Sequence, residues 1–213
     1  MARARRRVVR GALATAVALA ALTPSVAPAD IQEQRARLPP PAHCADPVIG
    51  RWRSHKYNPS YSDWTVFLIE VRRVPGDPSR LEGRITNESW NGGPSDPNAP
   101  TNCGPGLKHW RVGMPMQGTV TDGRIDVWGT SWTIEQQWCD RWTGYNLDHF
   151  TGQIDPELEE FQSVNNDGGR SIDEPTLFRR VECFDGPPPP PPHVTVTPPP
   201  FYPRLRAGGC SQD

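Results

Sequence analysis

Between residues 44 and 184, apolar side chains recur at every second position in short segments bounded by Gly, Pro, Asn and Asp. The alternation is clearest where Leu81, Gly83 and Ile85 are interleaved with charged or polar residues. A period of two buries one face of a β-strand and leaves the other in water. We therefore expect eight strands, at residues 50–57, 63–74, 80–90, 108–120, 124–138, 145–154, 159–166 and 175–183.

The connections between these segments are short and rich in turn residues. Residues 75–78, 121–123 and 166–169 carry the Pro, Gly, Asp and Asn combinations that favour tight turns. Short connections make consecutive strands antiparallel neighbours. Eight such strands with one apolar face lose their exposed edges by closing, so the sequence predicts an all-β protein, an eight-stranded antiparallel up-and-down barrel.

Four of the chain's eight tryptophans lie in one segment, RIDVWGTSWTIEQQWCDRWTG. Its alternation changes phase, because Ile125 and Val127 share one parity whereas Trp132 and Ile134 share the other. A β-bulge at Gly129 would switch the register and point all four side chains inward.

The first and last predicted strands carry short motifs, Gly50-Arg51-Trp52 and Leu177-Phe178-Arg179-Arg180-Val181. The first resembles the opening strand of the calycin group, the lipocalins and avidins, and the second is similar to the closing strand of avidin-type barrels. The resemblance implies a calycin-like barrel in which Trp52 packs at the closed end and Arg179 or Arg180 lies across it. It implies no ligand, because the biotin-contacting pattern of avidins does not carry over onto positions of this chain.

Five side chains are candidates for ligand binding. Trp132 and Trp110 offer large flat apolar walls with one N–H donor each, although a tryptophan in a small barrel also serves simply as core. Asn87, Ser89 and His149 continue the inward parity of their strands, where polar groups near an open end can orient a ligand. Solvation at a strand end explains the same three residues equally well.

Five cysteines bear on compartment and stability. Cys44 and Cys183 lie at the two limits of the barrel, where first and last strands are neighbours, and we expect them to pair. Cys103 and Cys139 would form the second disulfide, and chain-entropy estimates give roughly 5 and 4 kcal/mol for the two crosslinks. A four-cysteine zinc site is disfavoured because no C-x-x-C pair is present. Cys210 is left over, for pairing between molecules or as an incidental thiol.

The N-terminus has the composition of a secretory signal peptide at residues 1–29. Five arginines precede an apolar run at residues 11–22, and small residues ending at Ala29 form a cleavage site. The run is too short to cross a bilayer, so we expect no integral membrane segment in the mature chain. Without residues 1–29 the formal charge is 18 − 24, or −6. An acidic secreted protein, periplasmic or extracellular, is a poor partner for nucleic acid.

Proline-rich segments flank the predicted barrel domain at residues 44–184. Residues 30–43 are expected to form a linker, and residues 185–213 a disordered proline-rich tail. Proline runs at residues 187–192 and 198–200 favour an extended polyproline II conformation. Such a tail serves as a spacer or as a docking segment for a partner.

No catalytic or cofactor motif is recognisable, and His55, His109 and His149 lack metal-ligand spacing. The leading hypothesis is a secreted, non-enzymatic barrel that binds a small, partly apolar molecule. The first alternative is a surface interaction or structural module that works through its loops and the proline-rich tail. The second is a small secreted hydrolase that uses acidic residues brought together by the fold.

Overall fold

The computed structural model describes residues 29–184, so the predicted signal peptide, except for its last residue Ala29, and the predicted proline-rich tail lie outside the described residues. Strands dominate the chain. In chain order the elements are α1 (Ala29–Arg37), β1 (Gly50–Arg53), β2 (Lys56–Asn58), β3 (Asp63–Val74), β4 (Asp77–Asn91), β5 (His109–Thr121), β6 (Arg124–Gly129), β7 (Thr133–Gln137), β8 (His149–Asp155), β9 (Glu160–Asn165) and β10 (Glu174–Glu182).

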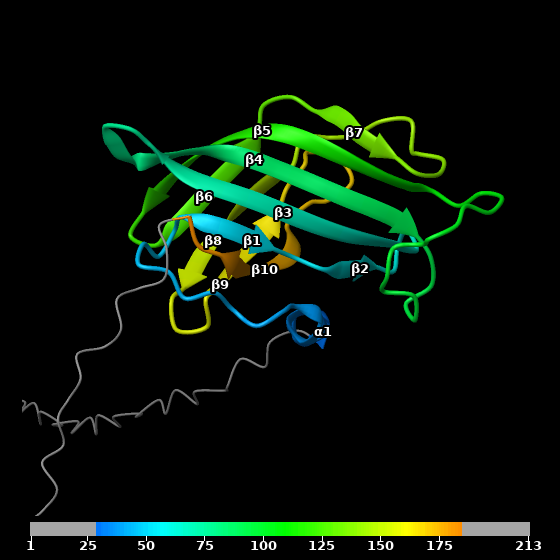
Figure 1. The fold of residues 1–213 in the computed structure, drawn as a ribbon, viewed down its shortest axis with the longest axis horizontal. Coiled ribbons are helices and arrows are strands. Elements are labelled where there is room, and N and C mark those ends of the chain that lie inside the picture. Colours follow the sequence, from blue (N-terminus) through cyan, green and yellow to red (C-terminus); the bar gives the residue numbers. More distant parts are fainter. Residues whose placement is uncertain (1–28, 185–213) are drawn as a thin grey trace, which may run out of the picture.

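The sheet closes into the predicted barrel (Figure 1). Consecutive strands pair antiparallel around the wall, and β1 completes the circle by pairing with both β10 and β3. The closed wall contains eight strands, β1, β3, β4, β5, β6, β8, β9 and β10. The short strands β2 and β7 pair with β3 and β5 respectively. The prediction of an eight-stranded up-and-down barrel is therefore confirmed.

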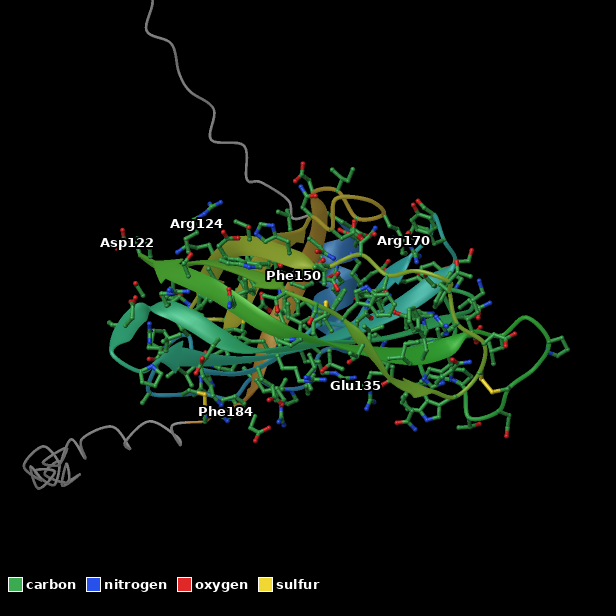
Figure 2. The ribbon with its side chains drawn as sticks, turned by 90° about the horizontal axis from the view of Figure 1, so that it is seen from above. Asp122, Arg124, Glu135, Phe150, Arg170 and Phe184 are labelled. Atoms are coloured by element: carbon green, nitrogen blue, oxygen red, sulfur yellow. A yellow bond between two sulfur atoms is a disulfide. The ribbon has the colours of Figure 1, made fainter. Side chains whose placement is uncertain are left out.

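The barrel has a closed end and an open end. The closed end carries the turns that include Asp122, and the open end carries the loop with Arg170, on opposite sides of the core residue Phe150 (Figure 2). Apolar side chains fill the interior from the closed end to the middle. There the rings of Phe67 and Phe178 each meet Phe150 edge-on, with centroids 4.9 Å apart, and form a floor beneath the open end.

A buried arginine seals the closed end. Arg180 is 1% exposed, and its guanidinium lies 5.1 Å from the ring centroid of Trp52. Its terminal nitrogens bond to the Glu159 carboxylate and, at 2.5 Å, to the carbonyl of Asp46. The Trp52 indole donates to the carbonyl of Val48 at 3.0 Å. The expected packing of a last-strand arginine across the first-strand tryptophan is therefore present, although family membership stays a prediction.

The backbone conformation and a close neighbouring strand explain why the Gly50-Arg51-Trp52 motif begins with glycine. Gly50 has a φ of +139°, and a Cβ atom there would lie 2.5 Å from the carbonyl oxygen of Glu182 on β10. A side chain at this position would strain the backbone and push apart the two strands that close the barrel.

Both predicted disulfides are present. Cys44 pairs with Cys183, next to the first and last strands at the closed end, with a Cα–Cα distance of 5.4 Å. Cys103 pairs with Cys139, which ties the 92–108 loop to the segment after β7. The two disulfides close loops in the unfolded chain between cysteines that are 139 and 36 residues apart in the sequence, which lowers the conformational entropy of that chain.

Helix α1 occupies the first half of the predicted linker at residues 30–43. β1 ends at Arg53, which leaves the open-end half of β10 without a strand neighbour on that side. The Gln34 side chain fills the gap, since its amide nitrogen donates to the Pro175 carbonyl at 3.2 Å and its oxygen accepts from the Leu177 N–H at 2.9 Å.

Among the residues described, no helix has the length and apolarity needed to cross a membrane.

The tryptophan-rich segment breaks at the predicted position. β6 ends at Gly129, where a Cβ atom would lie 2.8 Å from the Met114 sulfur, and β7 begins four residues later. Ile125 and Val127 are buried as expected. The inward placement of Ile134 is wrong, because this side chain is 36% exposed. β7 pairs with β5, but it does not pair with β8, which pairs with β6 instead. All five residues of β7 are therefore exposed to solvent.

Candidate functional site

A hollow of about 180 Å³ lies inside the open end, above the phenylalanine floor. Polar and aromatic side chains from five strands and two loops converge on it. Those that carry the argument below are Lys56, Asp63, Asn87, Ser89, Trp110, Trp142, Tyr145, Asp148, Asp167, Arg170 and Glu174.

Strand parity explains why the strand residues face inward. Lys56 lies on the same parity as Trp52, which is in the core, although the chain between them is interrupted. Asp63 likewise shares the parity of Phe67 on β3. The inward-facing side chains along these strands therefore change from apolar to polar toward the open end.

A chain of hydrogen bonds crosses the hollow from β4 to the loop before β8. Ser89 donates to the Asn87 side-chain oxygen at 2.7 Å, and Asn87 donates to the Tyr145 hydroxyl at 2.5 Å. The Tyr145 hydroxyl donates in turn to Asp148, whose other oxygen accepts from Asn165 at 2.7 Å. Both oxygens of this carboxylate are thus engaged, which fixes the loop side of the hollow.

Burial governs the protonation of this chain. It raises the pKa of Asp148 to about 7, against the opposing hydrogen bonds from Tyr145 and Asn165. The pKa of Tyr145 is raised well above its usual value of 10, first by burial and then by the Asp148 carboxylate. The tyrosine therefore keeps its proton at physiological pH, whereas Asp148 titrates near neutrality.

Two cations line the hollow, and each is paired with an acid. Lys56 Nζ lies 2.9 Å from a Glu174 oxygen, while burial lowers the pKa of this lysine. Arg170 bonds to one oxygen of Asp63 and stacks over Tyr61, with its guanidinium 3.8 Å from the ring centroid. Burial raises the pKa of Asp63, although Arg170 opposes the shift.

Two buried polar atoms at the hollow have no hydrogen-bond partner among the described residues. They are the Asp63 Oδ1 atom and the Trp110 Nε1 atom, on side chains that are 1% and 2% exposed. Buried polar atoms are nearly always satisfied, by protein groups, water or a ligand. The ring of Trp110 also lies near two aromatic neighbours, with centroids 6.1 Å from Trp142 and 5.8 Å from Tyr145.

The structure brings together three of the five predicted ligand-binding residues. Asn87, Ser89 and Trp110 all line the hollow. Trp132 does not line it; this partly buried ring packs against the apolar core, with its centroid 6.0 Å from that of Tyr145. The inward placement of His149 is wrong, since its Nε2 lies 2.5 Å from Asp126 on the outer face. The expected strand at residues 145–154 begins only at His149, so the parity counted from Tyr145 did not extend to it.

Several lining residues were missed by the sequence analysis. Lys56 and Asp63 could have been found by extending the inward parity to the strand ends, as was done for Asn87 and Ser89. Arg170 has no such signal, because it lies in a loop whose path no periodicity predicts. The same holds for Tyr145 and Asp148, which precede β8.

A larger hollow at the closed end is less suited to specific binding. Its volume is about 720 Å³, and it lies between turns that carry Pro78, Asp122 and Pro156. None of the buried polar atoms without a partner in the described residues belongs to its lining.

Within residues 29–184, no group of three or more His, Cys, Asp or Glu side chains is arranged to hold a metal ion.

The fold and the hollow together define a class, an antiparallel up-and-down barrel that is packed at one end and carries a polar, aromatic-walled hollow at the other. Comparisons of this chain with protein-family models, with curated proteins and with solved structures find no match.

Proposed function

We propose that this protein is a secreted, non-enzymatic barrel that binds a small, partly apolar molecule in the hollow at its open end. One observation carries the proposal. The hollow is lined by buried polar groups from separate strands, and two of them, on Asp63 and Trp110, have no partner in the described residues. A ligand that supplies a donor and an acceptor would satisfy both.

The size of the hollow limits the ligand. Its volume is about 180 Å³. Drug-sized ligands occupy pockets of about 300 to 1,000 Å³. The proposed ligand is therefore a small metabolite with one ring rather than a fatty acid or a polycyclic molecule.

Secretion is part of the proposal and has its own support. Two disulfides persist in oxidising compartments and are rare in the cytosol. Mass spectrometry of the culture supernatant or periplasmic fraction of the native host would test secretion and the cleavage after Ala29.

Intrinsic fluorescence tests ligand binding, because Trp110 and Trp142 line the hollow. A panel of single-ring metabolites should include compounds that change the emission and saturate. Trp110→Phe should remove most of that change, whereas Trp132→Phe, outside the hollow, should retain it. If no compound gives a saturable change, or if Trp132→Phe alone abolishes it, the proposed site is wrong.

A small hydrolase remains the second candidate, favoured by the pKa of Asp148. A carboxyl group with a pKa of about 7 beside ionised acids is the pattern of a general acid. Against catalysis, both oxygens of Asp148 are already bonded to Tyr145 and Asn165. Turnover of chromogenic glycosides or esters that Asp148→Asn abolishes would favour the hydrolase over the carrier.

A further inference from the structure

The charge around the hollow indicates the class of ligand that the proposed site would take. Acidic side chains outnumber basic ones in its lining, with Asp63, Asp148, Asp167 and Glu174 against Lys56 and Arg170. The excess remains when Asp148 carries a proton. An anionic ligand would meet three carboxylates, whereas a cationic ligand would be attracted.

The two basic groups are already paired, which strengthens this preference. Lys56 is held by Glu174 at 2.9 Å, and the guanidinium of Arg170 bonds to Asp63 and stacks on Tyr61. Neither cation could turn to an anionic ligand without leaving a buried or half-buried acid uncompensated. Removing one partner of a buried ion pair is strongly unfavourable.

The unpartnered carboxylate oxygen provides a specific contact for a cation. Asp63 Oδ2 receives Arg170, while Oδ1 lies buried without a partner in the described residues. An ammonium group has three donors and no acceptor, so it can satisfy Oδ1 without displacing Arg170. Hydrogen bonds between charged groups are also stronger than neutral ones in a buried site.

The aromatic walls and the Trp110 N–H describe the rest of the ligand. The rings of Trp110, Trp142, Tyr145 and Phe67 line the hollow and favour a flat ring or a cation placed against them. The Trp110 N–H is a donor that needs an acceptor. Asp63 lies on β3 and Trp110 on β5, with β4 between them, so their strands are about 10 Å apart. One end of the ligand would meet each residue.

We propose that the hollow binds a small aromatic amine, with its ammonium group on Asp63 and an oxygen at the far end of the ring accepting from Trp110. This inference rests on the proposed function and narrows it to one ligand class. Phenolic amines have the required length, positive charge and acceptor. Neutral and anionic molecules of similar shape, which differ mainly in lacking the positive charge, serve as controls.

The test compares four matched probes by isothermal titration calorimetry at pH 8. Tyramine carries both groups, tyrosol replaces the ammonium by a hydroxyl, 4-hydroxyphenylacetate replaces it by a carboxylate, and phenethylamine lacks the phenol oxygen. We expect tyramine to bind at least tenfold more tightly than tyrosol and phenethylamine. We expect 4-hydroxyphenylacetate to bind most weakly.

Two variants and one control assign the contacts. Asp63→Asn should remove the preference for tyramine over tyrosol, and Trp110→Phe should remove the preference for tyramine over phenethylamine. His149→Gln, on the outer face, should leave all four affinities unchanged. The selectivity of the unmodified protein needs no variant, so a folding defect in Asp63→Asn would not prevent the test.

Three results would overturn the inference. Equal binding of tyrosol and tyramine would exclude a charge-based site but leave the proposed function intact. Preference for 4-hydroxyphenylacetate would show that the site selects anions. Absence of binding by all four probes would exclude this ligand class, and the wider fluorescence screen would then decide whether any small molecule binds.

Discussion

At the closed end of the barrel Arg180 is enclosed by Trp52, Glu159 and backbone carbonyls, and only its Nε atom lacks a partner among the described residues. At the open end Asp63 and Trp110, whose side chains line the hollow, are just as deeply buried, and each has one polar atom without a partner in the described residues. The same types of side chain thus serve two purposes. Those at the closed end pack against one another and complete the fold, and those at the open end line a hollow, where Asp63 and Trp110 each keep one polar atom without a partner in the described residues.

Two aspartates show the difference in their protonation. Burial of Asp46 at the closed end acts to raise its pKa. Hydrogen bonds from Arg73 and from two backbone amides outweigh burial and hold the pKa below its usual value. Asp148 at the open end receives two side-chain donors, which do not offset its burial, and its pKa rises to about 7. The difference between the two aspartates therefore lies in their partners. A charged arginine and backbone N–H donors favour the ionised form of Asp46, whereas the neutral donors around Asp148 do not offset the cost of burying its charge.

The largest expected effect comes from removing the closed-end arginine. Arg180→Met should lower the free energy of unfolding by about 3 to 5 kcal/mol, because it removes the buried guanidinium from the buried Glu159 carboxylate and leaves it only the exposed His43 as an ionisable partner. Arg170→Met, the matched change at the open end, should cost less, since its side chain is 34% exposed and its partner Asp63 faces the hollow. Urea denaturation of both variants measures the difference. An equal or larger loss for Arg170→Met would contradict the proposed division between the two ends.

The next effect is a dependence of stability on pH at the open end. Folded Asp148 keeps its proton up to about pH 7, whereas the unfolded chain releases it near 3.8, so the folded state binds more protons between these values. Its contribution is therefore fully present below pH 3.8 and is lost as pH rises to 7, by up to about 4 kcal/mol.

Asp148→Asn isolates this contribution. The difference in unfolding free energy between the unmodified protein and the variant should shift in favour of the variant from pH 4 to pH 7, and stay constant above. Asp46→Asn should show the opposite sign, because a lowered pKa gives stability that is lost as pH falls. Parallel pH profiles for all three proteins would mean that burial of Asp148 has no energetic cost.

A smaller effect is expected on the side wall, where α1 covers the edge of β10. Gln34→Ala should cost about 1 to 3 kcal/mol, because the N–H of Leu177 and the carbonyl of Pro175 lose the Gln34 amide. Gln32→Ala changes the same residue type on the exposed side of the same helix and should cost under about 0.5 kcal/mol. Thermal unfolding compares them, and equal values would mean that α1 is a dispensable attachment.

Strand parity made much of this predictable from the sequence. It located the eight strands, the register break at Gly129 and three inward residues of the site, Asn87, Ser89 and Trp110. Closure of the barrel brought Cys44 to Cys183.

Periodicity fails where the chain is irregular or where tertiary contacts decide. Tyr145, Asp148 and Arg170 reach the hollow from loops, so no spacing in the sequence indicated them. Helix α1 has no apolar stripe, and it is fixed instead by Gln34 and by the ion pair of Arg35 with Glu160 on β9.

The most direct test of the difference between the two ends is hydrogen exchange of the tryptophan indoles, followed by proton–nitrogen NMR. Trp52 and Trp110 are both almost fully buried, but the Trp52 N–H is bonded to Val48 in the packed end, whereas the Trp110 side chain lines the hollow and its N–H has no partner among the described residues. We predict that the Trp110 indole exchanges at least tenfold faster than that of Trp52. Equal protection of the two, or faster exchange at Trp52, would contradict an open end that is accessible to small molecules.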